Sequence, residues 1–263
     1  MRYMPDNNLA YPILIKIDTG SCGSGFFLKS KNILYLVSAK HVFVKPSDDT
    51  FLCNKEFTLL AYSSDPMIKD PIKINVQFDS VKNDIKKHST SDIVIIKVGE
   101  VIYNEVDKTD VANFLTGIKI TSMPTGAQIV WMDDKVFKKY DEVFISNGVF
   151  ILGYPVSVGQ KGYEQIDIDR PLLRQGVVAG KNDKKRTIIL DSPVYFGNSG
   201  GLVLEVDIDN LGQRTFLPIG VVSEYVPFVE ELFSIQHKEV VSINRANSGY
   251  SVAVPIDTIL DLI

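Results

Sequence analysis

Short segments rich in Val, Ile, Leu, Phe and Tyr recur along the chain, and polar turn formers separate several of them. Their length and their content of branched and aromatic residues are typical of β-strands. We expect a first set of strands at 11–17, 24–29, 33–38, 57–62, 72–78 and 92–98. A second set follows residue 125, at 127–132, 149–155, 174–180, 187–191, 201–206, 217–223 and 250–255.

Many short strands at this spacing predict a β-sandwich or a β-barrel protein. The division into two sets further indicates two similar all-β halves, with a cleft where they meet. We place the first half at residues 1–105, a linker at 106–125 and the second half at 126–263.

Two stretches have a helical pattern instead. Residues 109–117, TDVANFLTG, predict a short helix inside the linker. In residues 255–263, PIDTILDLI, the proline suits a first helical turn, and Ile256, Ile259, Leu260 and Ile263 follow helical spacing. We expect this second helix to dock on the protein as its C-terminal element.

Composition and charge exclude several classes of partner. The formal net charge is −4, which provides no broad basic field for nucleic acid. No stretch approaches the roughly 18 apolar residues of a membrane span, and we identify no signal peptide. The two cysteines, Cys22 and Cys53, are too few for a disulfide scaffold. We therefore expect free thiols and a cytoplasmic location; a single disulfide in an exported chain is the minority alternative.

Three separated residues supply the parts of a nucleophilic site. His41 follows a strand and the small residues Ser38 and Ala39, and Asp92 precedes a strongly apolar strand. Ser199 lies in a glycine-rich turn, FGNSGG. A serine hydroxyl needs a base to take its proton and a carboxylate to orient that base, and these residues provide all three. Glycine also lets the N–H groups of Gly197 and Ser199 face a developing oxyanion.

The order His, Asp, Ser and the sequences around them resemble the chymotrypsin-like (trypsin-fold) serine peptidases, most closely the peptidase domain of the bacterial HtrA type without a PDZ domain. The resemblance covers residues from about Gly20 to Ile263. It is carried by six stretches in order: GSGFFLKSKNILYLVSAKHVF, DIVIIKV, ILGYPVSVG, RQGVVAG, DSPVYFGNSGGLVL and SVAVPIDTILDLI.

The resemblance implies two packed six-stranded antiparallel Greek-key β-barrels with a C-terminal helix. It implies a serine endopeptidase that works through an acyl-enzyme, with His41, Asp92 and Ser199 as the catalytic residues. Ser223 would hydrogen bond to Asp92, and residues 223–225 would pair with an extended substrate. The specificity pocket would have Pro193 at its floor and no acidic residue there. Its expected substrate-binding residues are Pro193, Val194, Ser223, Glu224, Tyr225, Val226 and Gly249.

This pocket composition favours small or medium aliphatic residues at the cleaved position, unless Asp191 or Glu224 points inward. One departure from the family concerns activation. Digestive relatives pair a new N-terminal amine with an aspartate just before the serine, and this chain has Asn198 there. Activation by that route is therefore not expected.

Other functions compete with this interpretation. A catalytically silent member of the fold would bind extended peptides. The motif G-x-S-x-G also occurs in α/β-hydrolase esterases, for which His237 is the downstream histidine. Cys22 is a weak candidate for a cysteine nucleophile. Residues 207–213 faintly resemble a calcium loop but place Leu211 at a ligand position. We expect His88 to be a solvated loop residue.

We expect no metal and no cofactor, since no Cys/His cluster has metal-ligand spacing. The expected partner is a protein or peptide substrate. A cytosolic peptidase needs restraint by a narrow recognition motif, by a regulatory protein partner or by a disordered resting site. The stretches 43–56, 156–173 and 227–248 are long enough to carry such control.

Overall fold

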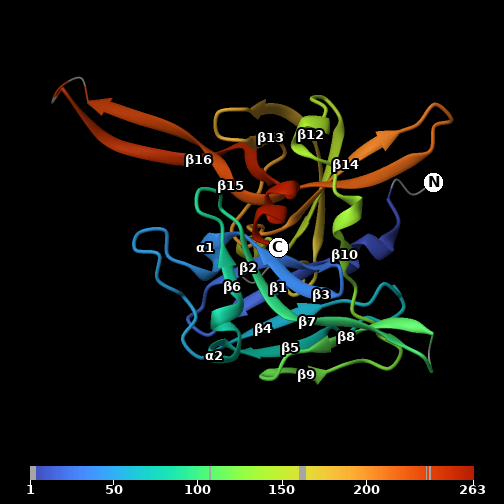
Figure 1. The fold of residues 1–263 in the computed structure, drawn as a ribbon. Helices are drawn as coiled ribbons and strands as arrows, with labels where there is room; N and C mark the ends of the chain where they lie inside the picture. Colours follow the sequence, from blue (N-terminus) through green and yellow to red (C-terminus); the bar gives the residue numbers. More distant parts are fainter. Residues whose placement is uncertain (1–3, 107, 160–163, 235, 237) are drawn as a thin grey trace.

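The structure is a computed structural model of the whole chain. It describes all residues except 1–3, 107, 160–163, 235 and 237. Two β-structures pack against each other, and two β-hairpins project from the upper one (Figure 1).

The first sheet contains the strands of the N-terminal half and curls into a barrel-like form. Its central strands run in the order β7-β3-β2-β1-β4-β5, with antiparallel pairing throughout. The strands of this sheet are β1 Pro12–Ile17, β2 Cys22–Ser30, β3 Ile33–Ser38, β4 Glu56–Ala61, β5 Ile72–Gln77, β6 Ile85–Lys87, β7 Val94–Asn104, β8 Thr109–Phe114, β9 Ile118–Ser122 and β10 Met132–Asp133.

The second sheet is a closed, six-stranded antiparallel barrel. Its strand order is β16-β13-β12-β11-β14-β15. This order matches that of the six central strands in the first sheet, where β7 takes the place of β16, and β3, β2, β1, β4 and β5 take the places of β13, β12, β11, β14 and β15. Its strands are β11 Gly148–Gly153, β12 Leu172–Asn182, β13 Thr187–Asp191, β14 Leu202–Ile208, β15 Arg214–Ser234 and β16 Glu239–Pro255. The expectation of two similar antiparallel halves is thus confirmed.

Helices are short throughout the described residues. The α-helices are α1 Lys40–Phe43, α2 Phe78–Val81 and α3 Val156–Gly159. The 3-10 helices are η1 Asp6–Ala10, η2 Lys82–Asp84, η3 Asp134–Val136, η4 Tyr140–Glu142 and η5 Ile256–Leu262. None of these helices is long and apolar enough to cross a membrane.

The predicted helix at 109–117 is wrong, because this segment forms strand β8. β7 continues to Asn104, well past its predicted end, and β8 pairs with its outer half. Pairing with β8 gives the backbone N–H and C=O groups on the exposed edge of β7 hydrogen-bond partners within the protein. This pairing outweighs the weak helical pattern of residues 109–117. The segment predicted as a linker, 106–125, therefore contains β8 and β9 of the first sheet.

The predicted strand at 127–132 is also largely wrong. Only the two-residue β10 forms there, and it pairs with β2 of the first sheet and not with the second barrel. The chain thus crosses between the sheets after β9 and enters the second barrel at Gly148. The apolar residues at 127–132 serve the first half instead, since Ala127 and Ile129 pack on its core.

The C-terminal helix exists, but as a 3-10 helix and not an α-helix. Its buried residues Ile256 and Ile259 are three positions apart. A 3-10 helix has three residues per turn, so both side chains face the same way. They enter an apolar cluster that contains residues of both sheets.

Among the described residues, four buried apolar clusters stabilise the fold, and the smallest joins Leu14 and Leu60 of the first sheet to Tyr154 of the second half. One fills the first sheet and one fills the second barrel. A third lies between them and joins side chains from β2, β3 and β7 to side chains from β11, β14 and β15. Because this third cluster is continuous across the boundary, the two halves meet on a dry apolar surface.

A buried ion pair fixes the crossing segment to the second barrel. Lys138 Nζ lies 3.1 Å from Glu205 Oε1 and 2.9 Å from Asp207 Oδ2. The Glu205 side chain is fully buried and the Lys138 side chain is 7% exposed. Removing one member of such a pair leaves an uncompensated buried charge.

We therefore expect Lys138→Met to lower the free energy of unfolding by about 3–5 kcal/mol, measured by urea denaturation. The matched control is Lys97→Met, which removes an exposed pair with Glu100 at 3.7 Å. That substitution should change the free energy of unfolding by about 1 kcal/mol or less. Equal effects of the two substitutions would contradict a structural role for the buried pair.

Candidate active site

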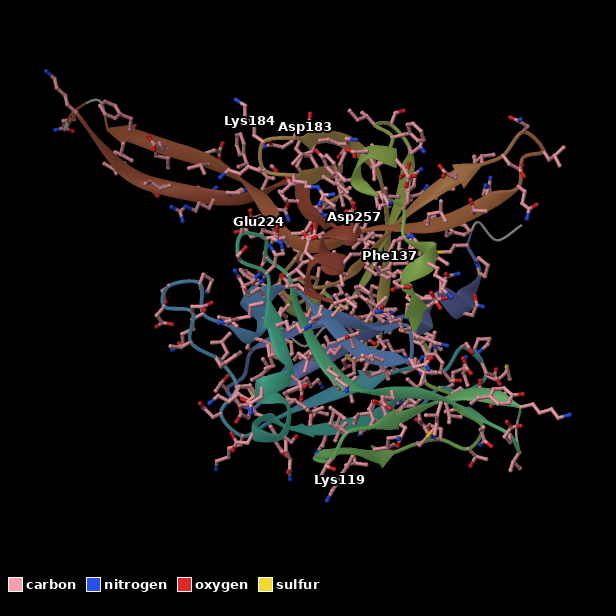
Figure 2. The ribbon with its side chains drawn as sticks, viewed as in Figure 1. Lys119, Phe137, Asp183, Lys184, Glu224 and Asp257 are labelled. Carbon is pink, nitrogen blue, oxygen red and sulfur yellow. The ribbon has the colours of Figure 1, made fainter. Side chains whose placement is uncertain are left out.

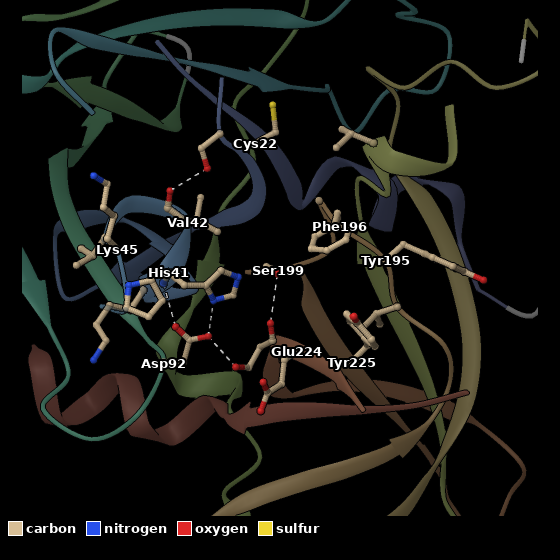
Figure 3. A pocket seen from close by; sticks show the side chains of 18 of the residues that line it. Cys22, His41, Val42, Lys45, Asp92, Tyr195, Phe196, Ser199, Glu224 and Tyr225 are labelled. Atoms are coloured by element: carbon tan, nitrogen blue, oxygen red, sulfur yellow. Dashed lines mark hydrogen bonds and ion pairs between the residues drawn. The ribbon is translucent and has the colours of Figure 1, made fainter. Parts of the chain in front are cut away.

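A cavity of about 740 Å³ lies between the two halves. Residues of both contribute to its lining (Figure 3). From the first half come His41 and Asp92, and from the second come Ser199, Ser223 and neighbouring residues. The structure therefore brings the three predicted catalytic residues to one cavity.

His41 lies in α1, the single helical turn that follows β3. Its Nδ1 lies 2.7 Å from Asp92 Oδ2, and its backbone N–H donates to Asp92 Oδ1 at 3.0 Å. A carboxylate only accepts hydrogen bonds, so Nδ1 carries the proton and Nε2 has a free lone pair. The imidazole is thus oriented as a base.

The loop before β7 positions Asp92. His88 Nδ1 accepts from the backbone N–H of Ser91 at 2.9 Å, and His88 N–H donates to Ile93 O at 3.0 Å. The expectation that His88 is merely solvated is wrong, because its side chain is only 15% exposed. It holds the turn that presents Asp92 to His41.

The carboxylate of Asp92 accepts a further hydrogen bond from Ser223 Oγ at 2.7 Å, which is the contact that the sequence resemblance implied. Burial raises the pKa of Asp92, but the hydrogen bonds from His41 and Ser223 and the nearby imidazole outweigh it, so the pKa lies below its ordinary value. Asp92 is therefore anionic at neutral pH and can stabilise an imidazolium.

Ser199 lies in a turn that depends on two glycines. Gly197 has φ +98° and Gly200 has φ +85°, the left-handed region that favours glycine. A Cβ on Gly200 would lie 2.0 Å from Ser24 O, and a Cβ on Gly197 would lie 2.2 Å from Tyr154 O. The turn can therefore lie this close to Ser24 of the first barrel and to Tyr154 of the second half only with glycine at these positions.

Asn198 reinforces this turn from within. It is 2% exposed, and its Oδ1 accepts from the backbone N–H of Tyr195 at 3.1 Å. Its own N–H donates to Tyr195 O at 2.9 Å. The side chain that replaces an aspartate of the digestive enzymes is thus used inside the turn.

The orientation of one peptide group supports an oxyanion site. Phe196 O accepts from Ser157 N at 3.3 Å and from Ser157 Oγ at 3.2 Å. The N–H of Gly197 belongs to the same trans peptide and points the opposite way. Within the described part of the chain, neither Gly197 N–H nor Ser199 N–H donates to another protein group. Both can therefore serve a ligand in the adjoining cavity.

The hydroxyl of Ser199 donates to Ser223 O at 3.2 Å (Figure 3). Between described residues, no hydrogen bond joins Ser199 Oγ to His41 Nε2 in this arrangement. Transfer of the hydroxyl proton to His41 requires the hydroxyl to leave Ser223 O and turn toward Nε2, and a hydroxyl group rotates to suit its partner.

Ser24, which sequence reasoning did not single out, joins the nucleophile turn to the first barrel. Its hydroxyl donates to Gly197 O at 2.6 Å and accepts from Tyr154 N–H at 2.9 Å. Its backbone N–H donates to Ser199 O at 2.7 Å. Ser24 is fully buried. The only sequence signal was its place between two glycines in GSG.

The predicted substrate-binding residues divide into two groups. Val194, Ser223, Glu224 and Tyr225 line the cavity, whereas the other three lie outside its lining: Pro193, Val226 and Gly249. The role of all seven residues in substrate binding stays a prediction. Val194 is only 2% exposed.

An aromatic pair that the sequence did not predict flanks this part of the cavity. The rings of Phe196 and Tyr225 meet edge to face, with centroids 6.2 Å apart. Tyr225 also packs on the core cluster of the second barrel that contains Val194. The two aromatic rings and Val194 therefore line the same cavity.

The remaining candidates do not form a second site. Cys22 lines the cavity, but burial raises the pKa of its thiol, which disfavours the nucleophilic thiolate. Residues 207–213 belong to the hairpin of β14 and β15, whose turn is closed by Asp209. His237 lies outside the described residues. Among the described residues, no group of three His, Cys, Asp or Glu side chains has the arrangement of a metal site.

Comparisons with known proteins identify the fold. No family model matches the chain, and no curated protein matches it in sequence. The solved structures that it resembles include Deg5, with a TM-score of 0.51 and 17% identity over 99% of this chain and 94% of that one. They also include a thermostable serine protease, AL20, from an extremophilic microorganism, with a TM-score of 0.52 and 9% identity over 97% and 95%.

The HtrA-type protease AlgW with tripeptide is a further match, with a TM-score of 0.45 and 14% identity over 98% of this chain and 62% of that one. Identities this low establish a shared fold and leave the chemistry to be argued from the site. The chain has the double β-barrel fold of the trypsin-like serine proteases over nearly its whole length.

The position of Ser24 generates a prediction. Ser24→Ala leaves Gly197 O and Tyr154 N–H without their buried partner, so the free energy of unfolding should fall by about 1–3 kcal/mol. Because the turn that carries Ser199 is then less constrained, kcat on a cleavable peptide should fall about 10-fold to 100-fold.

The control is Ser251→Ala, which removes another fully buried hydroxyl that donates to Ser192 O at 2.9 Å. Ser251→Ala should lower the free energy of unfolding but leave kcat within about twofold of the wild-type value, because this hydroxyl does not contact the turn that carries Ser199. If both variants lose stability and neither loses kcat, Ser24 does not position the nucleophile.

Proposed function

We propose that the chain is a serine endopeptidase that cleaves peptide bonds through an acyl-enzyme. One observation carries the proposal: His41, hydrogen bonded to Asp92, shares a cavity with Ser199 and with two N–H groups that no described residue accepts from. Nucleophile, base, orienting carboxylate and oxyanion donors are the groups that acyl transfer requires.

In this mechanism His41 Nε2 takes the proton of the Ser199 hydroxyl as Oγ attacks the scissile carbonyl carbon. Asp92 stays ionised and stabilises the imidazolium through Nδ1–H. The lowered pKa of Asp92 fits this role, because a protonated carboxyl would lose the charge that His41 needs.

The carbonyl oxygen becomes an oxyanion in the tetrahedral intermediate, and the N–H groups of Gly197 and Ser199 donate to it. His41 then gives its proton to the leaving amine, which departs and leaves an ester on Ser199. In the second half, His41 removes a proton from water, the hydroxide attacks the ester, and Ser199 recovers its proton.

A silent peptide-binding module is the second candidate. The observation in its favour is that the Ser199 hydroxyl donates to Ser223 O, with no hydrogen bond to His41 among the described residues. The esterase alternative is wrong as a fold, because apart from the short β10–β2 pair the strand pairs are antiparallel. An α/β-hydrolase needs parallel strands with helices between them.

The shape of the cavity supports a preference for small or medium aliphatic residues at the cleaved position. The side chain of that residue would enter beside Val194, where the ring of Tyr225 packs on the barrel core and meets Phe196. Large side chains would collide with these rings. Glu224 is exposed at the edge of the cavity and does not lie buried at its floor.

We further propose a cytoplasmic location, a protein or peptide substrate and restraint by substrate recognition or by a regulatory protein. Both cysteines are free thiols, which suits a reducing compartment. Within the third of the stretches expected to carry control, residues 227–234 and 239–248 form the outer parts of strands β15 and β16.

Cleavage of a peptide library, read by mass spectrometry, tests the proposed activity. Wild-type protein should cut the library, and Ser199→Ala should reduce the rate by about 10⁴-fold or more because the attacking oxygen is lost. Far-UV circular dichroism should show the same fold for both proteins. Cleavage by Ser199→Ala at the wild-type rate would overturn the proposal.

The same library tests the aromatic restriction. In Tyr225→Ala, the ratio of kcat/KM for substrates with Leu or Phe at the cleaved position to kcat/KM for substrates with Ala there should rise by about tenfold or more. The reason is that removal of the ring leaves room for several additional methylene groups in the pocket. Tyr195→Ala is the matched control, since that ring stacks on Arg174 at 4.7 Å and does not contact Phe196 in the described pairs. An unchanged Leu-to-Ala preference in Tyr225→Ala would show that the ring does not set the size limit.

A further inference from the structure

A long two-stranded arm extends from the second barrel. It consists of residues 227–234 of β15 and residues 239–247 of β16, which pair with each other from Pro227 and Asn247 outward. The arm projects away from both barrels, and its side chains reach into solvent on either side (Figures 1 and 2).

The arm exposes an unusual amount of apolar surface. Side chains that are 45–60% exposed follow one another along both strands: Phe228, Val229, Leu232, Phe233, Val240, Val241 and Ile243. A two-stranded hairpin is marginally stable alone, and a contiguous apolar surface on a protein usually marks an interaction site. The arm therefore has the properties of a binding element.

One edge of the arm continues directly from the candidate active site. β14 pairs with β15 only as far as Val221, and Ser223 O lies beside the Ser199 hydroxyl. Beyond that point β15 pairs with β16 on one edge, and no described strand pairs with its other edge. Tyr225 is the last residue of this strand that lines the cavity, so the free edge leaves the cavity beyond it.

The side chains of β15 alternate in a definite pattern along this edge. One face of the arm carries Phe228, Glu230 and Leu232, and the other carries Val229, Glu231 and Phe233. Both glutamates are exposed, and Asn244 Nδ2 donates to Glu230 Oε2 at 3.3 Å. Each face thus presents a carboxylate between two apolar side chains.

The mechanism fixes which half of a substrate meets the arm. His41 gives its proton to the leaving amine, so the leaving half lies on the His41 side of Ser199. Tyr225 and Phe196 lie on the opposite side, as Figure 3 shows. The acyl half, N-terminal to the scissile bond, therefore extends toward Tyr225 and the arm.

Resting on the proposed function, we infer that the free edge of β15 in the arm binds the substrate segment N-terminal to the scissile bond as an added strand. That segment carries two adjacent basic residues flanked on each side by apolar residues. In an added strand, alternate side chains face each side of the sheet, so the basic pair meets Glu230 and Glu231 on the two faces.

A second copy of the chain fits this edge less well. Edge-to-edge pairing of β15 with β15 of another copy would bring Glu230 and Glu231 close to the same residues of that copy, and like charges across strands repel. The edge of β16 lies on the far side from the cavity lining. Continuity with the cavity and charge complementarity together favour the substrate.

Fluorescence anisotropy with the Ser199→Ala protein tests the inference without requiring catalysis. The probe is a fluorescein-labelled peptide, Val-Ile-Lys-Arg-Val-Ile, followed by a six-residue alanine–glycine spacer and Ala-Ala-Ala. Its matched partner has Glu-Glu in place of Lys-Arg. We expect the Lys-Arg peptide to bind about tenfold more tightly, because two attractive cross-strand pairs become repulsive in the partner.

The double variant Glu230→Lys/Glu231→Lys, made in the Ser199→Ala protein, should reverse this preference. The control Asp79→Lys/Glu105→Lys makes the same charge change at exposed positions of the first half and should leave it unaltered. Equal binding of the two peptides, or the same shift in both double variants, would overturn the inference.

Two further readouts separate the alternatives. Sedimentation velocity should show a monomer; a dimer that Phe233→Glu dissociates would instead assign the arm to a second copy. If the protein cleaves no peptide of the library but still prefers the Lys-Arg peptide, the proposed peptidase activity is refuted and the arm remains a peptide-binding edge. If the protein cleaves the library but binds the Lys-Arg and Glu-Glu peptides equally, only the proposed role of the arm is refuted.

Discussion

A single buried hydroxyl, that of Ser24, joins the two barrels at the point where the nucleophile turn lies. It bonds to Gly197 O and Tyr154 N–H, while its own backbone N–H bonds to Ser199 O. The close approach requires glycine at position 200, where a Cβ would meet Ser24 O. Through this contact the first barrel, which carries His41 and Asp92, fixes the segment of the second barrel that carries Ser199.

Strand β15 provides the second connection. Ser223 donates to Asp92 and its carbonyl accepts from Ser199, so one residue contacts both halves of the candidate triad. The same strand then leaves the cavity and becomes the arm. The contacts of Ser223 in the candidate site and the arm thus depend on one continuous piece of backbone, and among the described strands only β16 pairs with its outer part.

Much of the fold could be predicted from the sequence because alternating and branched apolar segments specify strands locally. The positions of His41, Asp92 and Ser199 could be predicted as well, since each has a recognisable local context and their order matches a known family. Edge pairing was not predictable. Residues 109–117 have a helical pattern, yet Thr109–Phe114 pair as β8 with the outer half of β7, which continues to Asn104 and so beyond the strand end that the sequence pattern indicates.

The arm and Ser24 were missed for related reasons. The stretch 227–248 contains charged residues and lacks a strong strand pattern, so the sequence predicts no regular element there; residues 227–234 and 239–247 become strands because they pair with each other. Ser24 is a small residue in a glycine-rich strand, and its importance arises from contacts to residues more than 100 positions away. Such contacts exist only after the barrels have packed.

The central claim is that the imidazole of His41 activates the hydroxyl of Ser199 across the interface between the barrels. The most direct measurement is intact-protein mass spectrometry after reaction with a fluorophosphonate, with the modified residue located by peptide mapping. The account predicts one adduct, on Ser199, and a labelling rate that falls by orders of magnitude in His41→Ala. An unlabelled wild-type protein, or equal labelling of His41→Ala, would contradict it.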